Sequence, residues 1–306
     1  MVILALTFTF NFLLPHANAV DVAVTLSAQT GKVGDSIRVT GTINKTDSKY
    51  QVWFGSQIIV EANATDNDVN ATFSVPSVPE GNYTVTLQDV DMNLNATTWF
   101  FVGTSYYIKA ITPTKPVQLQ QGSEVEILVT ITGGKQNTVY VANVTVKTPS
   151  PSNQTYWALV TLPNTSDTGE GRSSVAYPTL FSSNANTNYT GIYNVDFNGT
   201  GTALATDNFT IGLTSFTEYH RFQTVDIKAE GYNPSENVTV AISFGGQTVN
   251  LAENASASEG GTIQTNWTVP SNATVGTYTV NITSTSTAPT IKIPKDVQNF
   301  AVPGFD

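Results

Sequence analysis

The residues of this chain that could carry chemistry are asparagines in the motif Asn-x-Ser/Thr, whose side-chain amide accepts N-linked glycans in exported proteins. The motif occurs sixteen times, whereas 27 asparagines and the chain's serine and threonine content would give roughly six matches by chance. The excess predicts substantial N-glycosylation, against the alternative that Asn and Thr are ordinary surface residues of an acidic β-protein. The candidate acceptors are Asn44, Asn63, Asn70, Asn82, Asn95, Asn143, Asn153, Asn164, Asn188, Asn198, Asn208, Asn237, Asn254, Asn266, Asn272 and Asn281.

Residues for catalysis are scarce. The chain has no cysteine, which excludes thiol nucleophiles, and His220 is the one histidine beyond the first nineteen residues. Catalytic triads and zinc sites built on histidine therefore have little to use, and His220 is expected at the surface. No nucleophile elbow, P-loop or dinucleotide-binding motif occurs, and no spacing singles out a pair of carboxylates for glycoside hydrolysis. We expect no enzymatic activity and no cofactor.

Two Asp-rich strings, residues 66–70 (DNDVN) and 89–93 (DVDMN), faintly resemble calcium-binding loops. Both lack the glycine at position six and the glutamate at position twelve that an EF-hand requires. Each lies between alternating apolar segments, where Asp and Asn are common turn residues. The turn interpretation is favoured, and no metal site is predicted.

The elements that must position these residues are strands that begin with Gly-x-Tyr. The string recurs at residues 81–85, 191–195 and 276–280, and apolar residues follow each Tyr at every second position. This period of two predicts a strand with the Tyr on its buried face, while an intervening residue such as Asn82 or Asn281 faces solvent. The glycine is expected to make a tight turn at which a Cβ would clash.

Each string is followed by an aromatic-x-β-branched strand end, at residues 100–102, 209–211 and 300–302. The Gly-x-Tyr-x-Val string resembles the Gly-x-Tyr-x-Cys of immunoglobulin domains, with valine in place of the second cysteine. The resemblance implies that each Tyr hydroxyl bonds the backbone upstream of it. The predicted fold is all-β, with three tandem immunoglobulin-like β-sandwich domains.

The predicted domains are residues 20–103, 104–212 and 213–306. The first and third share a Phe-Gly-x-Gln turn, at residues 54–57 and 244–247, and a Val-Pro pair before the Gly-x-Tyr string. The middle domain is longer, because residues 149–188 form an insertion in which residues 157–160 are predicted to be a strand between loops. The short junctions near residues 103 and 212 predict a fairly stiff string of sandwiches.

The N-terminus predicts export. Residues 2–14 are apolar, Pro15 interrupts them, and Ala17-Asn18-Ala19 fits a cleavage site, so residues 1–19 are predicted to be a signal peptide. An N-terminal strand is disfavoured because residues 2–14 do not alternate. No later segment is apolar over a spanning length, so no transmembrane helix is predicted in the mature chain.

An exported chain without cysteine points to a prokaryotic cell surface. The sequence has no cluster of Lys and Arg residues, so nucleic-acid binding is not predicted. The corner strings, the Phe-Gly-x-Gln turns and the final Pro-Gly-Phe resemble the tandem immunoglobulin-like repeats of large archaeal cell-surface proteins, of the S-layer or adhesin type. The resemblance implies an N-glycosylated structural or adhesive module, with other cell-surface proteins, further copies of itself or glycans as partners. Two rivals stay open: an adhesin with a defined carbohydrate or protein ligand, and an accessory region of a secreted hydrolase.

A contact surface is also predicted in the first domain. Matching Phe100 to Phe209 turns Trp99 and Phe101 outward, and the third domain pairs Trp53 with an outward serine. Trp53, Trp99 and Phe101 would then gather on one solvent face, as large aromatics do at contact sites. The alternative is that a shift of register or a bulge buries them.

Overall fold

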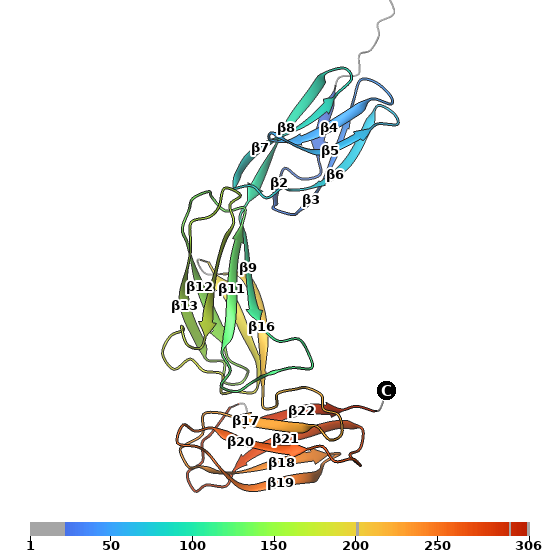
Figure 1. The fold of residues 1–306 in the computed structure, drawn as a ribbon. Helices are drawn as coiled ribbons and strands as arrows, with labels where there is room; N and C mark the ends of the chain where they lie inside the picture. The colour runs from blue at the N-terminus through green and yellow to red at the C-terminus, as the bar shows by residue number, and fades with distance from the viewer. Residues whose placement is uncertain (1–21, 200–201, 294, 305–306) are drawn as a thin grey trace, which may run out of the picture. The chain divides into compact units, whose positions relative to one another are not determined.

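The computed structural model describes residues 22–199, 202–293 and 295–304, so the predicted signal peptide lies outside the described residues. Within these ranges every regular element is a strand, labelled β1 to β22 (Figure 1). The described residues contain no helix with the length and hydropathy needed to cross a membrane. The chain divides into two compact units, Met1–Gly103 and Thr104–Asp306.

Unit 1 is one β-sandwich. A three-stranded sheet, in the order β1-β3-β6, faces a five-stranded sheet in the order β2-β8-β7-β4-β5. Strand β2 pairs with β8 in parallel, whereas the other pairs are antiparallel. The strands are β1 (Ala23–Leu26), β2 (Thr30–Lys32), β3 (Ser36–Thr42), β4 (Lys49–Phe54), β5 (Gln57–Asn63), β6 (Asp68–Ser74), β7 (Gly81–Asp89) and β8 (Leu94–Gly103).

The first half of unit 2 repeats this design. The sheets run β14-β11-β9 and β10-β16-β15-β12-β13, and β10 pairs with β16 in parallel as β2 does with β8. Figure 1 shows β9 and β11 side by side, in agreement with their antiparallel pairing. The strands are β9 (Ser105–Ile111), β10 (Leu119–Gln120), β11 (Val125–Thr132), β12 (Tyr140–Lys147), β13 (Thr155–Leu162), β14 (Gly171–Tyr177), β15 (Gly191–Asn198) and β16 (Ala203–Gly212).

The second half of unit 2 is the smaller sandwich, with sheets β17-β20 and β19-β18-β21-β22. Its chain enters through residues that bridge both sheets, since Thr214 pairs with Ile227 of β17 and Glu218 with Ala301 of β22. The two bridges take the places of β1 and β2, which pair with β3 and β8 in unit 1. The strands are β17 (Thr224–Ala229), β18 (Asn237–Phe244), β19 (Gln247–Ser256), β20 (Ile263–Thr268), β21 (Gly276–Ser284) and β22 (Val297–Val302).

Each sandwich has its own hydrophobic core among the described residues, and the Gly-x-Tyr strand crosses the centre of each. Val85, Val195 and Val280, which stand where immunoglobulin domains have cysteine, are completely buried in the three cores. The prediction of three tandem immunoglobulin-like sandwiches is therefore confirmed. The boundary near residue 212 stays a prediction, because residues 104–306 form one compact unit.

The three tyrosines close the corners that the resemblance implies. The hydroxyls of Tyr83, Tyr193 and Tyr278 each donate a hydrogen bond to the carbonyl four residues upstream, at distances of 2.9, 3.1 and 3.0 Å. Tyr193 and Tyr278 are buried and stack on the phenylalanine of the next strand. Tyr83 is half-buried and stacks on Phe54 instead.

The corner glycines differ from the prediction in one of the three copies. Gly191 and Gly276 have φ of +133° and +143°, and a Cβ at Gly276 would lie 2.9 Å from the Phe244 ring. Glycine is required at both positions, because other residues rarely adopt that backbone conformation. At Gly81 a Cβ would meet no atom closer than 3.8 Å, so the predicted clash is wrong there.

The insertion of the middle sandwich holds more structure than its composition suggests. The predicted strand at residues 157–160 is confirmed as the centre of β13. However, residues 171–177, which were predicted to be loop, form β14 and pair with β11 over seven residues. Strand β14 fills the position of β6 in unit 1, so the extra length is an ordinary sandwich strand with longer connections.

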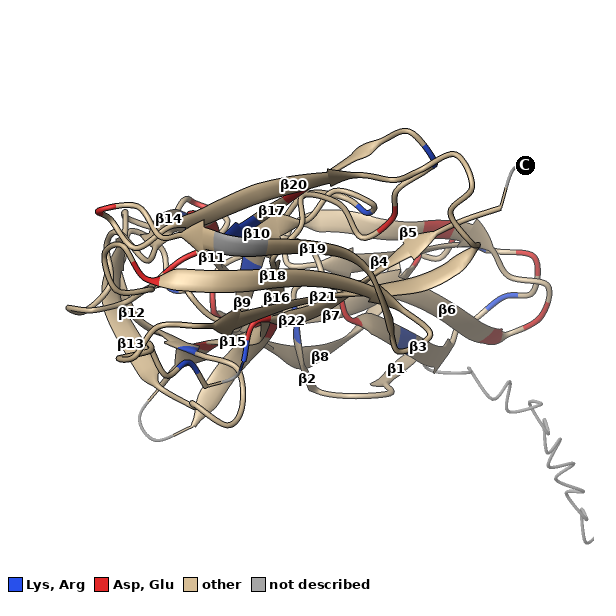
Figure 2. Ribbon diagram, turned by 90° about the horizontal axis from the view of Figure 1, so that it is seen from below, with Lys and Arg blue, Asp and Glu red and all other residues tan. Residues whose placement is uncertain are grey.

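Charged residues are sparse on these strands. Figure 2 shows blue and red positions scattered singly along loops and strand ends, with most of the strands tan. Charged residues make up 12% of the sequence. The outer sheet faces are consequently covered mainly by hydroxyl, amide and apolar side chains.

Candidate functional site

The candidate glycosylation asparagines lie mostly on the outside of the sandwiches. None of the fifteen whose side chains the structure describes is buried. Asn44, Asn188 and Asn198 are half-buried, and the side chain of Asn254 lies outside the described part of the chain. The exposed positions are Asn63, Asn70, Asn82, Asn95, Asn143, Asn153, Asn164, Asn208, Asn237, Asn266, Asn272 and Asn281.

Strand geometry explains the exposure. Asn143 lies between the buried Ala142 and Val144 of β12, and Asn281 lies between the buried Val280 and Ile282 of β21. Since successive side chains of a strand point to opposite faces, each Asn must face outward when its neighbours pack in the core. The amide nitrogen, to which a glycan attaches, is then open to solvent.

The three half-buried asparagines are held by protein contacts. Asn198 Nδ2 donates to Thr145 Oγ1 at 2.8 Å, so its amide already has a partner. Asn188 lies against Gly231, where a Cβ would come within 2.7 Å of Asn188 Nδ2. Asn44 follows the buried Ile43, and its backbone N–H donates to the Asp89 carboxylate. A glycan on any of these would have to displace or crowd a packed neighbour.

The predicted contact residues all belong to the outer face of the five-stranded sheet of unit 1. Trp99 is 62% exposed and Phe101 is 38% exposed, while the neighbouring Phe100 is buried. Trp53 is half-buried, because its ring lies along the sheet with Nε1 donating to Gln88 Oε1 at 3.0 Å. Trp99 pairs with Thr84 and Trp53 with Thr86, so the small threonines of β7 separate the rings.

A second exposed apolar surface lies on the middle sandwich, where the sequence analysis did not find one. Trp157 and Leu159 of β13 are 54% and 64% exposed, and Val141 of β12 is 60% exposed. Strand β13 is the edge of its sheet. The alternation of buried Tyr156 and Ala158 with Trp157 and Leu159 was a signal available in the sequence, since it places the latter two outward.

The first calcium-like string runs from the bend before β6 into that strand, and the second runs from the end of β7 through the turn to β8. The buried Asp89 carboxylate accepts hydrogen bonds from Ser48 Oγ at 2.6 Å and from the N–H groups of Asn44 and Met92. Asp66 accepts the N–H of Asp68 two residues on, as an Asx turn does. No group of three or more acidic, His or Cys side chains among the described residues could hold a metal ion. The carboxylate oxygens of Asp89 thus serve protein donors.

His220 lies at the surface, with Nε2 3.9 Å from the carboxylate of Glu218 and its side chain largely exposed. It borders a hollow lined by Phe216, Tyr219 and Gln223. No serine, second histidine or thiol lies among the lining residues. Thr224 also lines the hollow, and its hydroxyl shares a hydrogen bond with Thr268 Oγ1 at 3.4 Å.

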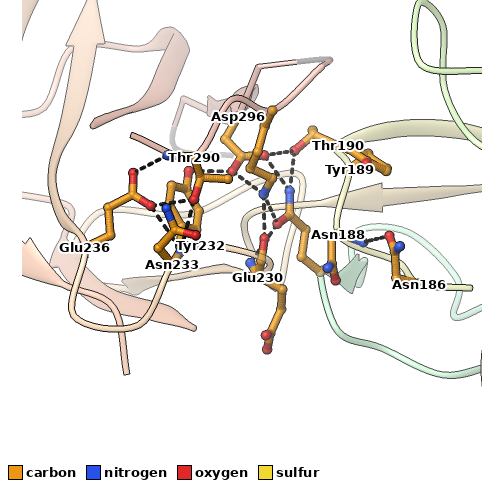
Figure 3. Close-up of polar contacts among 12 residues, drawn as sticks. Asn186, Asn188, Tyr189, Thr190, Glu230, Tyr232, Asn233, Glu236, Thr290 and Asp296 are labelled. Carbon is orange, nitrogen blue, oxygen red and sulfur yellow. Dashed lines mark hydrogen bonds and ion pairs between the residues drawn. The ribbon is translucent and has the colours of Figure 1, made fainter. Parts of the chain in front are cut away.

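The most extensive polar cluster of unit 2 joins its two sandwiches. At its centre, Asp296 is buried and Figure 3 shows Thr190, Glu230 and Tyr232 around it. Asp296 Oδ2 accepts hydrogen bonds from Lys292 Nζ and from the Tyr232 hydroxyl, each at 2.6 Å. All of these residues except Thr190 belong to the smaller sandwich.

Gln121 is the link from the other side. This buried residue stands between β10 and β11, and its Nε2 donates to Asp296 Oδ1 at 2.6 Å. Its Oε1 accepts from Lys292 Nζ at 2.9 Å and from the Glu230 N–H at 2.8 Å. The nitrogen and the oxygen of the Gln121 side-chain amide therefore both have hydrogen-bond partners in the smaller sandwich, and these partners fix the orientation of the amide. We call Gln121, Thr190, Glu230, Tyr232, Lys292 and Asp296 the polar junction.

The electrostatics of the polar junction match its burial. Burial lowers the pKa of Lys292, and the charge of Asp296 opposes that shift. Burial also raises the pKa of Tyr232 well above its usual range, and the Asp296 charge raises it further. Tyr232 is thus a neutral hydrogen-bond donor at physiological pH. The Lys292 ammonium lies 4.7 Å from the centre of the Tyr232 ring. Gln121 and Thr190 of one sandwich bond Asp296 of the other, so the cluster connects the two sandwiches through hydrogen bonds.

Nearby glutamines add further hydrogen bonds at the connection between the two sandwiches. Gln118 and Gln120 side chains donate to the carbonyls of Thr214 and Leu213, and Gln120 also reaches the Asp226 carbonyl. Gln298 of β22 accepts from the N–H groups of Leu213 and Thr214. The segment that leaves β16 is therefore held by side chains of both sandwiches.

Comparisons with known proteins give a likeness of fold alone. No protein-family model matches the sequence, and no curated protein matches it either. Among solved structures, the chain is similar to a tetra-tandem repeat in the extending region of a large adhesion protein, with a TM-score of 0.26 and 16% identity over 92% of this chain and 74% of that chain.

Two further structures resemble it at the same level. The ICAM-5 D1–D4 ectodomain fragment gives a TM-score of 0.27 and 10% identity over 92% of this chain and 76% of that chain. Trypsin-activated alpha-2-macroglobulin from Escherichia coli gives 0.23 and 10% identity over 94% of this chain and 24% of that chain. At TM-scores of 0.23 to 0.27 these matches show a likeness of fold alone.

Proposed function

We propose that this chain is a non-enzymatic, N-glycosylated structural and adhesive module of a cell-surface protein. The observation that supports it best is the placement of the Asn-x-Ser/Thr asparagines: twelve of fifteen described side chains are exposed and none is buried. Glycan attachment needs this exposure, and the excess of the motif, sixteen occurrences against roughly six expected by chance, favours glycosylation over ordinary surface composition. Glycans on these faces would cover sheet surfaces that carry few charges.

The polar junction supports the structural part of the proposal. A chain that acts as a stiff spacer needs neighbouring sandwiches that do not swing freely. In unit 2 a buried ion pair, a buried amide and three further glutamines join the two sandwiches through hydrogen bonds. Removing that freedom is a mechanical function and needs no ligand.

The location follows from the same proposal. Export would proceed through the predicted signal peptide, residues 1–19, and the mature chain would begin at Val20, on the surface of a prokaryote of the archaeal type that the sequence resembles. N-terminal sequencing of the protein recovered from its native envelope would begin at Val20. Recovery of an uncleaved chain from the cytosol would contradict the location.

The test of the glycosylation is site mapping. The protein is produced in a host with an N-glycosylation pathway, and its glycopeptides are identified by mass spectrometry. We expect occupancy at the exposed asparagines, with lower occupancy at Asn188 and Asn198, whose side chains contact neighbours. A protein with no modified asparagine would contradict the proposal.

A second candidate function is protein binding through Trp53, Trp99 and Phe101. The exposure of Trp99 and Phe101 favours it, because aromatic groups of this size in solvent are typical of contact surfaces. Other cell-surface proteins or further copies of the chain would be the partners. Sedimentation of wild type against a Trp99→Ser, Phe101→Ser variant tests it, and equal behaviour as monomers would contradict self-association.

A further inference from the structure

Each of the two exposed apolar surfaces has an asparagine of the glycosylation motif beside it. In unit 1, Asn82 of β7 is paired directly with Phe101 of β8, and Trp99 is two residues along. In the middle sandwich, Asn143 of β12 is paired directly with Leu159 of β13, and Trp157 is two residues along. The same arrangement thus occurs on two different sheets.

Register places the partners within reach of one sugar. Residues directly opposite in an antiparallel pair have Cβ atoms about 4.5–5.5 Å apart, and diagonal neighbours lie about 7–8 Å apart. Asn82, Phe101 and Trp99 are all exposed and so point to the same side of their sheet, as do Asn143, Leu159 and Trp157. A glycan leaving the asparagine amide starts beside the exposed apolar side chains.

The chemistry of the surfaces fits a pyranose. A sugar ring has an apolar C–H face, which packs on the negative face of an aromatic ring, and hydroxyls at its rim. Thr84 lies opposite Trp99, and Thr145 lies opposite Trp157. Aromatic rings flanked by threonine hydroxyls offer a neutral amphipathic ligand both kinds of contact.

The surfaces also need a cover. Strand β13 is the edge of its sheet, and exposed apolar side chains on an edge strand favour pairing with other chains. A covalently attached glycan gains contact with these side chains without the loss of translational freedom that a separate partner incurs. The tether therefore favours the chain's own glycan over a second molecule.

We propose that N-linked glycans on Asn82 and Asn143 fold back onto the protein and cover Phe101 with Trp99 and Leu159 with Trp157, respectively. This inference rests on the proposed glycosylation, and it goes further by naming the glycans as the groups that contact the exposed aromatic residues. The first sugars of each glycan are the ligand, and their C–H faces contact the rings. A covered surface is closed to self-association, so this inference is the alternative to the second candidate function, in which Trp99 and Phe101 bind a protein.

Hydroxyl-radical footprinting read at the level of peptides tests this directly, since it reports the solvent access of each tryptophan separately. The glycosylated full chain is compared with Asn82→Gln and Asn143→Gln variants from the same host. A sugar that covers about half of an exposed ring should lower its oxidation about twofold. We expect Trp99 oxidation to rise in Asn82→Gln and Trp157 oxidation to rise in Asn143→Gln, each without effect on the other.

Asn70→Gln is the matched control. Asn70 is an exposed motif asparagine on the opposite sheet of unit 1, where it pairs with Thr40. Its replacement should change neither tryptophan. Glycopeptide masses from the same digest verify that Asn82 and Asn143 carry glycans in the wild type.

The outcomes separate the two proposals. Glycans on Asn82 and Asn143 with unchanged tryptophan oxidation on their removal would overturn this inference and leave the glycosylation standing. Glycans at other sites but not at these two would do the same. Protection of Trp99 that persists without the glycan, in a chain that sediments as a dimer, would assign the surface to a second copy. An absence of glycans at every asparagine would overturn both proposals.

Discussion

Two regions of the molecule depart from the rule that apolar side chains are buried and charged ones exposed. They are the outer face of β7 and β8 and the polar junction of unit 2. On the outer face, the large apolar Trp99 lies in solvent, and its neighbours are hydroxyls and amides. In the junction, the charged Lys292 and Asp296 are buried, and their neighbours are hydrogen-bonding partners. The charged groups of the junction thus find their partners within unit 2, whereas Trp99 and Phe101 stay exposed to solvent among the described residues.

The largest expected effect comes from breaking the junction. Asp296→Ala leaves the Lys292 ammonium buried without its carboxylate, at a cost of about 3–5 kcal/mol to folding. Calorimetry of the full chain measures this as a lower Tm. The double variant Lys292→Met, Asp296→Leu removes both charges and should cost less, with the remaining loss due to the Gln121 amide and the Tyr232 hydroxyl that it leaves without Asp296. Equal losses for the single and double variants would show that the charges are not the reason.

The next largest effect comes from the tyrosine corners. The loss of stability should differ between unit 1 and unit 2, because their tyrosines are buried to different extents. Tyr193→Phe deletes a buried hydroxyl that bonds both the carbonyl and the N–H of Tyr189, at a cost of about 1–3 kcal/mol. Tyr83→Phe deletes one bond from a half-buried ring and should cost about 0.5–1.5 kcal/mol. Urea denaturation compares the two variants. A larger loss at Tyr83 would contradict the difference in burial.

Acid should weaken the smaller sandwich through Glu236. Burial raises the pKa of its carboxyl, but hydrogen bonds from Ser284, from the hydroxyl and N–H of Thr290 and from the Asn233 N–H outweigh it and lower the pKa to about 2. The stability that this carboxylate contributes is present above pH 4.5 and is lost as pH falls toward 2. A Glu236→Gln variant should show a smaller loss of Tm between these pH values. An unchanged acid profile in that variant would remove Glu236 as a cause.

The smallest expected effect on stability belongs to the outer face. Trp99→Ser with Phe101→Ser should change the free energy of unfolding by less than about 0.5 kcal/mol per residue, because both rings lie outside the core. Phe100→Ala is the matched control on the same strand, and loss of that buried ring should cost about 3–5 kcal/mol. A comparable collapse in the outer-face variant would show that its rings are core residues.

The sequence predicted the features that depend on local periodicity. Alternation placed Tyr193 and Val195 inside and Asn82 and Asn281 outside, and the recurrence of Gly-x-Tyr placed the three corners. It could not predict that Gly81 is dispensable, because that depends on which atoms pack around the turn. Strand β14 was missed because Gly171 and Ser173 take two of its four inward positions, so its apolar alternation is short.

The polar junction could not be predicted from the sequence. Gln121 is 175 residues from Asp296, and both lie in polar segments that resemble ordinary loops. Burial of a charged side chain is decided by tertiary contacts, and only the meeting of the two sandwiches supplies the partners. The Trp157 and Leu159 surface is different, since its alternation was visible within a single strand.

The most direct test of the central claim is the intact mass of the chain secreted by its native host, before and after chemical removal of glycans. The account predicts a mass above that of the polypeptide beginning at Val20 by several glycans, which falls to the polypeptide mass on deglycosylation. Solubility should fall with the glycans, while Tm should change little, because the modified asparagines lie outside the cores. A secreted chain that has the bare polypeptide mass from the start would contradict the account.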